Sequence, residues 1–209
     1  MGGAQDAEQL PRGRHGLTRE QVVASQRKRM VKAMSQAVSD KGYAHTSVAD
    51  VIAIAGVSRE TFYEQFAGKE ECFLAAYDAG VESVLRAMQA SLREVADDPA
   101  EVYSRALAAY LHTLSRDPAI ARTFNVEVYA VGPAAIKRRM ALMDRFVDVT
   151  SEMLGARTPQ ARFACEALVA AISSLVTNRV GIGQAADLPS LHAPLMDLVR
   201  RALGGQMFD

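Results

Sequence analysis

The sequence has few cysteines and histidines and no tryptophan. It contains 2 cysteines, Cys72 and Cys165, and 4 histidines among 209 residues. The two cysteines are far apart and have no His or Cys neighbour at metal-ligand spacing, which argues against a disulfide framework or a zinc site. Both lie in apolar helical patterns, and this favours buried free thiols. We therefore predict no metal and no cofactor.

An excess of one charge and a long apolar run are also missing. Lys and Arg number 24, as do Asp and Glu, so the formal net charge is zero. A nucleic-acid site would therefore have to come from local charge. Without a run of about 18 apolar residues no membrane span is expected. The polar residues 1–10 do not resemble a secretory signal. These features predict a cytoplasmic protein.

Motifs of common enzyme classes are absent. There is no glycine-rich phosphate loop, no Gly-x-Ser-x-Gly elbow, no clustered His and Cys ligands and no convincing pair of carboxylates. The sequence therefore predicts no enzyme and no catalytic residues.

What the sequence does contain is helical periodicity along nearly its whole length, with no convincing pair of strands. Capping residues, glycines and prolines divide it into nine helices, so the expected fold class is all-α. Three short helices precede residue 69, and a long helix from about 69 to 96 follows. The predicted organisation is a disordered basic arm (1–16), a small three-helix domain (17–68) and a larger helical domain (69–209).

Residues 46–66 have the pattern of a helix-turn-helix. Gly56 supplies the tight turn, since a positive φ costs little only for glycine. Ser58 caps the next helix, whose first turn is then free to face DNA. Phe62 and Phe66 are expected to be buried behind it. The side chains left pointing outward are Arg59, Thr61, Tyr63 and Gln65.

Any small helical hairpin can show the same cap, glycine and apolar spacing, so the surrounding charge matters. From Arg12 to Lys41 there are eight basic residues and two acidic ones, a net of +6 in a chain of zero net charge. A basic run is usually a solvated face. Because this one adjoins a helix-turn-helix, it favours a surface that faces phosphate.

The string Ser47-Val-Ala-Asp-Val-x-x-x-Ala-Gly-Val-Ser-x-x-Thr-Phe-Tyr-x-x-Phe-x-x-Lys-Glu-x-x-Phe-Leu74 closely resembles the signature of the tetracycline-repressor (TetR) family. The resemblance covers the first third of the chain. It implies a TetR-like nine-helix fold in which the large domain binds a ligand and dimerises. It also implies a ligand-responsive transcriptional regulator, usually a repressor released from a palindromic operator.

The resemblance also implies roles for individual residues. Thr46 or Ser47 would touch phosphate, and Tyr63 would contact the DNA backbone. Lys69 would reach phosphate at the start of the fourth helix. The residues expected at the groove are Ser58, Arg59 and Thr61, and the residues expected in a minor-groove arm are Arg12 and Arg14. Two residues depart from the family pattern, Ile52 and Ile54, and Ile52 could widen the angle between the two short helices.

Family members dimerise so that two recognition helices reach successive major grooves, about 34–36 Å apart. The resemblance implies a homodimer through the last two helices. The helix from Pro159 carries small residues at Ala164, Ala167, Ala170, Ala171, Ser173 and Ser174, and the last helix carries a stripe of Leu191, Leu195 and Leu198. The alternative is that both stripes belong to the core of a single chain.

The helices between Pro99 and Val180 are expected to hold a pocket for an unknown, mostly apolar effector. The pocket candidates are Phe124, Tyr129, Met140, Met143 and Phe146, with His112 and Asn178 as polar anchors. Residues of these apolar types are more often plain core than pocket lining, and a lone histidine is more often an ordinary satisfied residue. A second functional hypothesis therefore stands beside the first: a helical small-molecule-binding protein of TetR fold with weakened or absent DNA binding, which Ile52 and Ile54 would permit.

Overall fold

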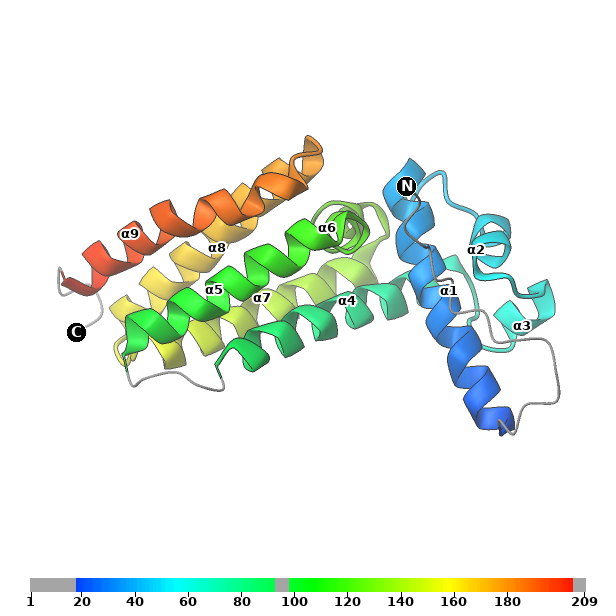
Figure 1. Ribbon diagram of the computed structural model, residues 1–209, viewed down its shortest axis with the longest axis horizontal. Helices are drawn as coiled ribbons and strands as arrows, with labels where there is room; N and C mark the ends of the chain where they lie inside the picture. The colour runs from blue at the N-terminus through cyan, green and yellow to red at the C-terminus, as the bar shows by residue number, and fades with distance from the viewer. Residues whose placement is uncertain (1–17, 93–97, 205–209) are drawn as a thin grey trace, which may run out of the picture.

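The computed structural model describes residues 18–92 and 98–204, and every regular element in that part of the chain is helical (Figure 1). The first three helices are α1 (Arg19–Lys41), α2 (Val48–Ala55) and α3 (Arg59–Tyr63). The helices that follow are α4 (Lys69–Ser91), α5 (Pro99–Arg116), α6 (Pro118–Asn125), α7 (Pro133–Met153), α8 (Pro159–Gly181) and α9 (His192–Gly204). The all-α prediction with nine α-helices is confirmed for the described residues.

Local sequence signals set most of the helix starts. Thr18 and Ser47 form capping boxes with Gln21 and Asp50 at the starts of α1 and α2. In a capping box two otherwise unpaired backbone N–H groups are satisfied reciprocally. The helices α5, α6, α7 and α8 each begin with proline, whose missing N–H costs nothing at the first helical position.

Two short 3-10 helices were not expected from the sequence. The first, η1 (Glu127–Ala130), follows α6, and the second, η2 (Ala185–Leu191), fills the segment before α9 that the sequence suggested would be a loop. The long helix α4 ends at Ser91, with Leu92 in the C-cap position. Its predicted end near Ala96 falls on residues 93–97, which lie outside the described residues.

Figure 1 shows a small unit of α1–α3 at one end of the molecule and a bundle of α4–α9 beside it, with α8 and α9 along one long edge. The buried apolar side chains form two clusters, which do not divide at residue 69. The first, here the N-terminal cluster, joins α1–α3 to α4, α6 and α7, and includes Met30, Phe62, Tyr77, Phe124 and Leu142. The second, here the bundle cluster, includes Leu111, Leu114, Ile172, Leu188 and Met196.

Within the described residues one helix, α8, is long and apolar enough to cross a membrane by length and composition alone. A core helix of a water-soluble protein meets the same criterion. On α8 the side chains of Cys165, Ile172 and Val176 are buried in the bundle cluster. Only 33% of the apolar stretch of α8 is buried, so packing against the bundle accounts for part of its apolar character.

Candidate nucleic-acid interface and ligand cavity

The first turn of α3 is exposed and polar. Ser58 caps the helix by accepting a hydrogen bond from the Thr61 backbone N–H at 3.0 Å, and the two hydroxyl groups lie 2.9 Å apart. The Arg59 guanidinium lies over the Tyr63 ring, 5.4 Å from its centroid, and donates to the Tyr63 hydroxyl at 3.4 Å. Guanidinium, hydroxyl and phenol groups on an exposed first helical turn are suited to phosphate and base-edge contacts.

The opposite side of α3 is closed. Phe62 and Phe66 are buried, and their ring centroids are 5.5 Å apart. The turn before α3 is fixed by Gly56, which adopts the left-handed conformation with φ 62° and ψ 44°. A β-carbon there would also lie 3.5 Å from the Arg29 guanidinium. The sequence expectations for Gly56, Phe62 and Phe66 agree with this geometry.

Two of the expected DNA contacts do not face solvent. The Thr46 side chain is buried, and its hydroxyl donates to the Gly42 carbonyl at 2.8 Å, so it is not available to a phosphate. The Gln65 amide turns back toward α1 and donates to the Val23 carbonyl at 3.4 Å. Both corrections have the same cause: a polar side chain near a helix end satisfied a backbone carbonyl nearby instead of pointing outward.

Ser47, the alternative to Thr46, is exposed at the start of α2. Its backbone N–H donates to the Asp50 carboxylate at 2.7 Å. Lys41 also pairs with that carboxylate, at 2.7 Å. The Lys41 ammonium and the Ser47 hydroxyl and N–H hold the pKa of Asp50 well below its usual range. The group is therefore a fixed negative charge that stabilises the start of α2.

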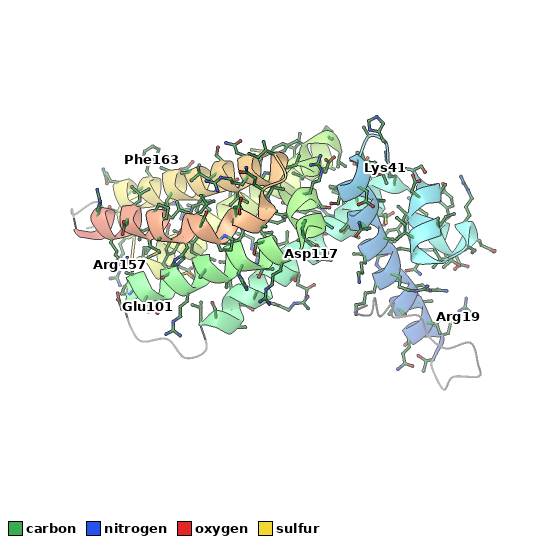
Figure 2. All side chains as sticks on the ribbon, turned by 45° about the horizontal axis from the view of Figure 1, so that its top comes forward. Arg19, Lys41, Glu101, Asp117, Arg157 and Phe163 are labelled. Carbon is green, nitrogen blue, oxygen red and sulfur yellow. The ribbon has the colours of Figure 1, made fainter. Side chains whose placement is uncertain are left out.

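Part of the basic run in α1 serves the fold. Arg29 donates to the Ala55 carbonyl at 2.7 Å and so satisfies the end of α2. Arg27 lies over the Phe66 ring, 4.3 Å from its centroid. The exposed basic side chains of α1 include Arg19, Lys28 and Lys32, and Figure 2 labels Arg19 near the end of α1 opposite Lys41. The expected arm residues Arg12 and Arg14 lie outside the described residues.

The two departures from the family pattern lie in different places on α2. Ile52 is half-buried and packs against the N-terminal cluster. Ile54 is 51% exposed. An effect of Ile52 on the angle between the short helices stays a prediction.

A buried junction connects the helix-turn-helix to the bundle through the segment between α1 and α2. The Tyr43 backbone N–H donates to the Glu127 carboxylate of η1 at 2.8 Å. Glu127 is 6% exposed and also pairs with Arg122 at 2.9 Å. The Lys69 ammonium donates to the Tyr43 carbonyl at 3.0 Å and lies 4.1 Å from the centroid of its ring. The chain turns into this segment at Gly42, whose φ of 80° is a conformation that residues with a β-carbon rarely adopt.

An apolar, partly open cavity of about 50 Å³ lies between α4, α5, α7 and α8. Burial raises the pKa of Tyr103 and Tyr110 in its wall, so both phenols are neutral at ordinary pH. Two of the predicted pocket residues, Met143 and Phe146, line it. The other lining residues include Met88, Leu107, Val149, Met153, Val169, Ile172 and Ser173.

A separate groove of about 630 Å³ runs along α7 and α8. Three predicted pocket residues, Tyr129, Met140 and Asn178, lie in this groove and are exposed. Met143, Val169 and Ser173 line both the groove and the cavity, and so form the wall between them. The groove is also lined by three charged residues, Asp144, Glu166 and Arg139.

Two of the predicted pocket residues belong to neither space. Phe124 is buried in the N-terminal cluster, where its ring stacks on Tyr77 with centroids 5.3 Å apart. His112 is exposed on α5 and lines neither the cavity nor the groove. The apolar pattern identified Phe124 as buried but could not distinguish a closed core from the wall of a cavity. It was wrong in treating Met140 as buried, since this side chain is 64% exposed.

The sequence reasoning missed several residues of the site. The tyrosines Tyr103 and Tyr110 are on α5, where the sequence suggested His112 alone as a pocket candidate. Glu127 gave no local signal, because its partner is 84 residues away in the chain. Arg139 did give a local signal. By helical spacing it is a charged residue on the apolar face of α7 that includes Ile136 and Met143.

The expected dimer stripe of α9 is mostly core. Leu191 and Leu195 are buried, whereas Leu198 is 53% exposed. The small residues on α8 are different, since Ala167, Ala170, Ala171 and Ser174 are exposed. Larger apolar side chains flank them at Phe163 (69% exposed) and Ile182 (71%), and Figure 2 shows Phe163 projecting outward from α8.

Comparisons with known proteins agree with this geometry. Residues 32–76 match the model of the bacterial regulatory proteins of the tetR family. The HTH-type transcriptional regulator EthR of Mycolicibacterium smegmatis is 25% identical over 151 residues, which are 70% of this chain. The match spans 66% of EthR, slightly under two thirds of its length.

Solved structures share the fold. The fatty acid degradation regulator FadR of Bacillus halodurans superposes with a TM-score of 0.72 at 18% identity, over 83% of this chain and 94% of that one. A transcriptional regulator of Rhodococcus sp. RHA1 gives 0.71 at 24% identity, over 86% and 96%. FadR of Bacillus subtilis, solved in complex with stearoyl-CoA, gives 0.68 at 17% identity, over 82% and 96%.

The exposed first turn of α3, with Gly56 and Ser58 before it, has the geometry of a helix-turn-helix. Residues 32–76 are similar to the bacterial regulatory proteins of the tetR family, and the all-helical fold is shared with the solved structures above.

Proposed function

We propose that this regulator binds a palindromic DNA operator as a homodimer and is released from it by a small, mostly apolar effector. One observation carries the proposal: the chain combines an exposed polar turn on α3 with an apolar cavity in the bundle behind it. As in most members of the family, the outcome at the promoter is repression, and the protein acts in the cytoplasm.

DNA is read by the first turn of α3. Arg59 and Thr61 contact base edges in the major groove, and Ser58 and Tyr63 contact the backbone. Ser47 contributes a phosphate contact at the start of α2. Lys69 contributes another, because an ammonium group has three protons and the Tyr43 carbonyl accepts only one of them.

The homodimer forms through α8 and the exposed side of α9. The exposed Ala167 and Ala171 of α8, which do not line the groove, allow a partner helix to approach closely. Phe163, Ile182 and Leu198 add apolar surface that water would otherwise cover. The mass in solution tests this step: a strict monomer at micromolar concentration contradicts it, and Ala171→Glu is expected to convert a dimer to monomers.

The effector occupies the cavity between α4, α5, α7 and α8. The wall is apolar and aromatic, and two of its residues are methionines of the kind that adapt to irregular contents. The stearoyl-CoA bound to Bacillus subtilis FadR is an apolar chain with a polar end, and it supports an effector of amphipathic character here.

Effector binding is coupled to DNA through the junction of Tyr43, Lys69 and Glu127. When the effector binds and enlarges the cavity, it displaces α4 or α6. The first residue of α4 is Lys69, and η1 follows the end of α6. Gly80 of α4 lies close to α6, because a β-carbon there would be 3.3 Å from Ile120. A displacement of either helix therefore moves the Tyr43 segment, and with it α2 and α3. The effector must prefer the conformation that does not bind DNA, and a hundredfold preference corresponds to about 2.7 kcal/mol.

The decisive experiment selects operators from random double-stranded DNA and then measures affinity against salt concentration. Arg59→Ala is expected to weaken the selected sequences preferentially, by about 1–3 kcal/mol. Lys69→Ala is expected to weaken all sequences and to reduce the salt slope by about 1. Failure to enrich any sequence, with binding to DNA that does not depend on salt, would contradict the proposal.

A second candidate is a small-molecule-binding protein of the same fold that binds DNA weakly or not at all. The observation that favours it is Ile54, an apolar side chain 51% exposed on α2 close to the proposed interface. The same operator selection distinguishes the two candidate functions, because only the DNA-binding regulator is expected to enrich an operator sequence. Effector titration with and without operator then tests the coupling, since equal effector affinity in both would leave only the second candidate.

A further inference from the structure

The bundle buries a cation without a carboxylate beside it. Arg139 on α7 is 5% exposed. Its guanidinium donates to three neutral oxygens: Nε to the Tyr129 hydroxyl at 2.6 Å, Nη1 to the Phe124 carbonyl at 3.2 Å and Nη2 to the Ser173 hydroxyl at 2.7 Å. Neutral acceptors satisfy the hydrogen bonds but leave the charge uncompensated, which is costly at a buried position.

The acidic groups closest along the neighbouring elements are paired with other arginines. Glu127 of η1 pairs with Arg122 at 2.9 Å. Asp78 of α4 pairs with Arg138, the residue before Arg139. Among residues 18–92 and 98–204, the recorded ion pairs do not include Arg139. Within this part of the chain, the direct partners of the Arg139 guanidinium are therefore neutral oxygens, and no carboxylate is in contact with it.

Arg139 lies where an amphipathic molecule would place its polar end. It lines the groove, and its hydrogen-bond partner Ser173 lines both the groove and the apolar cavity. Met143 and Val169 complete the wall between the two spaces. The cavity of about 50 Å³ accommodates only the first carbons of an apolar tail, so a longer tail requires its wall to move. Met143 in that wall is a flexible side chain, and the head group would remain in the groove beside the guanidinium.

The groove also limits the charge that the head group can carry. Asp144 and Glu166 line it and are exposed. Two carboxylates near the opening repel a head group with several negative charges, whereas a single carboxylate gains a charge-assisted, bidentate contact with a guanidinium. The arrangement thus favours a monoanion over a polyanion.

We propose that Arg139 binds the carboxylate of an apolar monoacid whose tail occupies the cavity between α4, α5, α7 and α8. This inference rests on the proposed effector-binding role of the cavity and specifies the chemical class of the effector. Binding of the carboxylate also gives Arg139 a fourth partner, which competes with its hydrogen bonds to Phe124 and Tyr129 at the two ends of the segment that carries Glu127.

The first test uses the unaltered protein and four probes with the same tail: octanoate, 1-octanol, octylamine and octyl phosphate. Isothermal titration calorimetry is expected to show octanoate binding at least about tenfold tighter than 1-octanol, with octylamine weakest and octyl phosphate weaker than octanoate. Equal affinity for octanoate and 1-octanol would overturn the assignment. The tightest binding by octyl phosphate would also overturn it, in favour of a phosphate head group.

The second test compares Arg139→Met with Arg138→Met, a matched change at the preceding residue of α7, which lines neither the cavity nor the groove. In Arg139→Met the octanoate affinity is expected to fall to that of 1-octanol, while the 1-octanol affinity is unchanged. Arg138→Met is expected to keep the preference for octanoate. Retention of the preference in a folded Arg139→Met, with native helical circular dichroism, would overturn the assignment; if that variant does not fold, the four-probe series alone decides.

The results separate this inference from the proposed function. Binding of 1-octanol and octanoate without preference overturns the role of Arg139 and leaves the cavity as an effector site. No binding by any of the four probes overturns both the carboxylate site and the apolar effector. DNA binding is decided separately by operator selection.

Discussion

The N-terminal cluster and the bundle cluster are built from similar apolar residues but are packed differently. Around Phe62 the interior is closed, and even the polar groups nearby, such as Thr46 and Arg29, are engaged with backbone carbonyls. The bundle instead contains a cavity and a buried cation at Arg139 that lacks a carboxylate. A closed interior keeps the DNA-facing surface of α3 in a fixed shape. A cavity beside a buried guanidinium is instead suited to binding a small molecule.

The largest expected effect comes from making the same truncation in the two regions. Phe62→Ala removes a fully buried ring from a closed interior and should lower the free energy of unfolding by about 3–5 kcal/mol. Phe146→Ala removes a half-buried ring from the wall of an existing cavity and should cost about 2 kcal/mol or less. Urea unfolding followed by circular dichroism measures both. Equal losses would remove the contrast between the two interiors.

The next effect concerns the junction between the regions. Glu127→Gln keeps the shape of the side chain but removes its charge, so both the Tyr43 N–H and Arg122 lose a charged acceptor. The free energy of unfolding should fall by about 2 kcal/mol. The exposed Glu152→Gln on α7 is the control and should be nearly neutral. If Glu127→Gln also left effector-dependent release of DNA unchanged, the junction would not transmit the signal.

A smaller effect is expected at the start of α2. Ser47→Ala removes the side-chain cap and should cost about 1 kcal/mol in unfolding free energy. The Asp50 carboxylate of the same capping box has a pKa below its usual range, so the stabilisation it provides is complete above about pH 4 and is lost as the pH falls further. The stability difference between the wild type and Asp50→Asn should therefore narrow below that pH. A difference independent of pH would contradict the role given to the carboxylate.

The smallest expected effect is on the rate at which the two cysteines react with thiol reagents. Burial raises the pKa of the Cys72 thiol to about 12, and burial also raises the pKa of Cys165. Since the thiolate is the reactive form, both should resist thiol reagents at pH 8 until the surrounding helices open. Cys165, in the cluster that borders the cavity, should be labelled before Cys72 in low denaturant, as read by peptide mass spectrometry. Simultaneous labelling would mean that the two regions open together.

The sequence predicted those features that depend on neighbours in the chain. Capping by Ser47 and Ser58, the turn at Gly56 and the burial of Phe62 all follow from residues within a few positions of one another. Most of the helix starts were predicted for the same reason, whereas the 3-10 helices η1 and η2 were not. The exposed Arg59 and Tyr63 followed from the burial of the opposite face of α3.

The features that could not be predicted depend on distant partners. Thr46 and Gln65 were expected to point outward, but carbonyl groups of Gly42 and Val23 accept their hydrogen bonds. The role of Glu127 depends on Tyr43, and Phe124 proved to be closed core only because Tyr77 stacks on it. Periodicity identifies a buried face, but whether that face meets a side chain or an empty space depends on the shape of the opposing helix.

The hydrogen bond between Tyr43 and Glu127 bears on how this protein can be recombined with its relatives. A chimera that joined residues 1–68 to a foreign sensor would leave the Tyr43 N–H without its carboxylate. It would also leave Phe62 and Met30 without their packing partners on α4, α6 and α7. The unit that can be exchanged is therefore not the helix-turn-helix alone. A graft intended to give this DNA surface a new effector must carry η1 and the matching faces of those three helices with it.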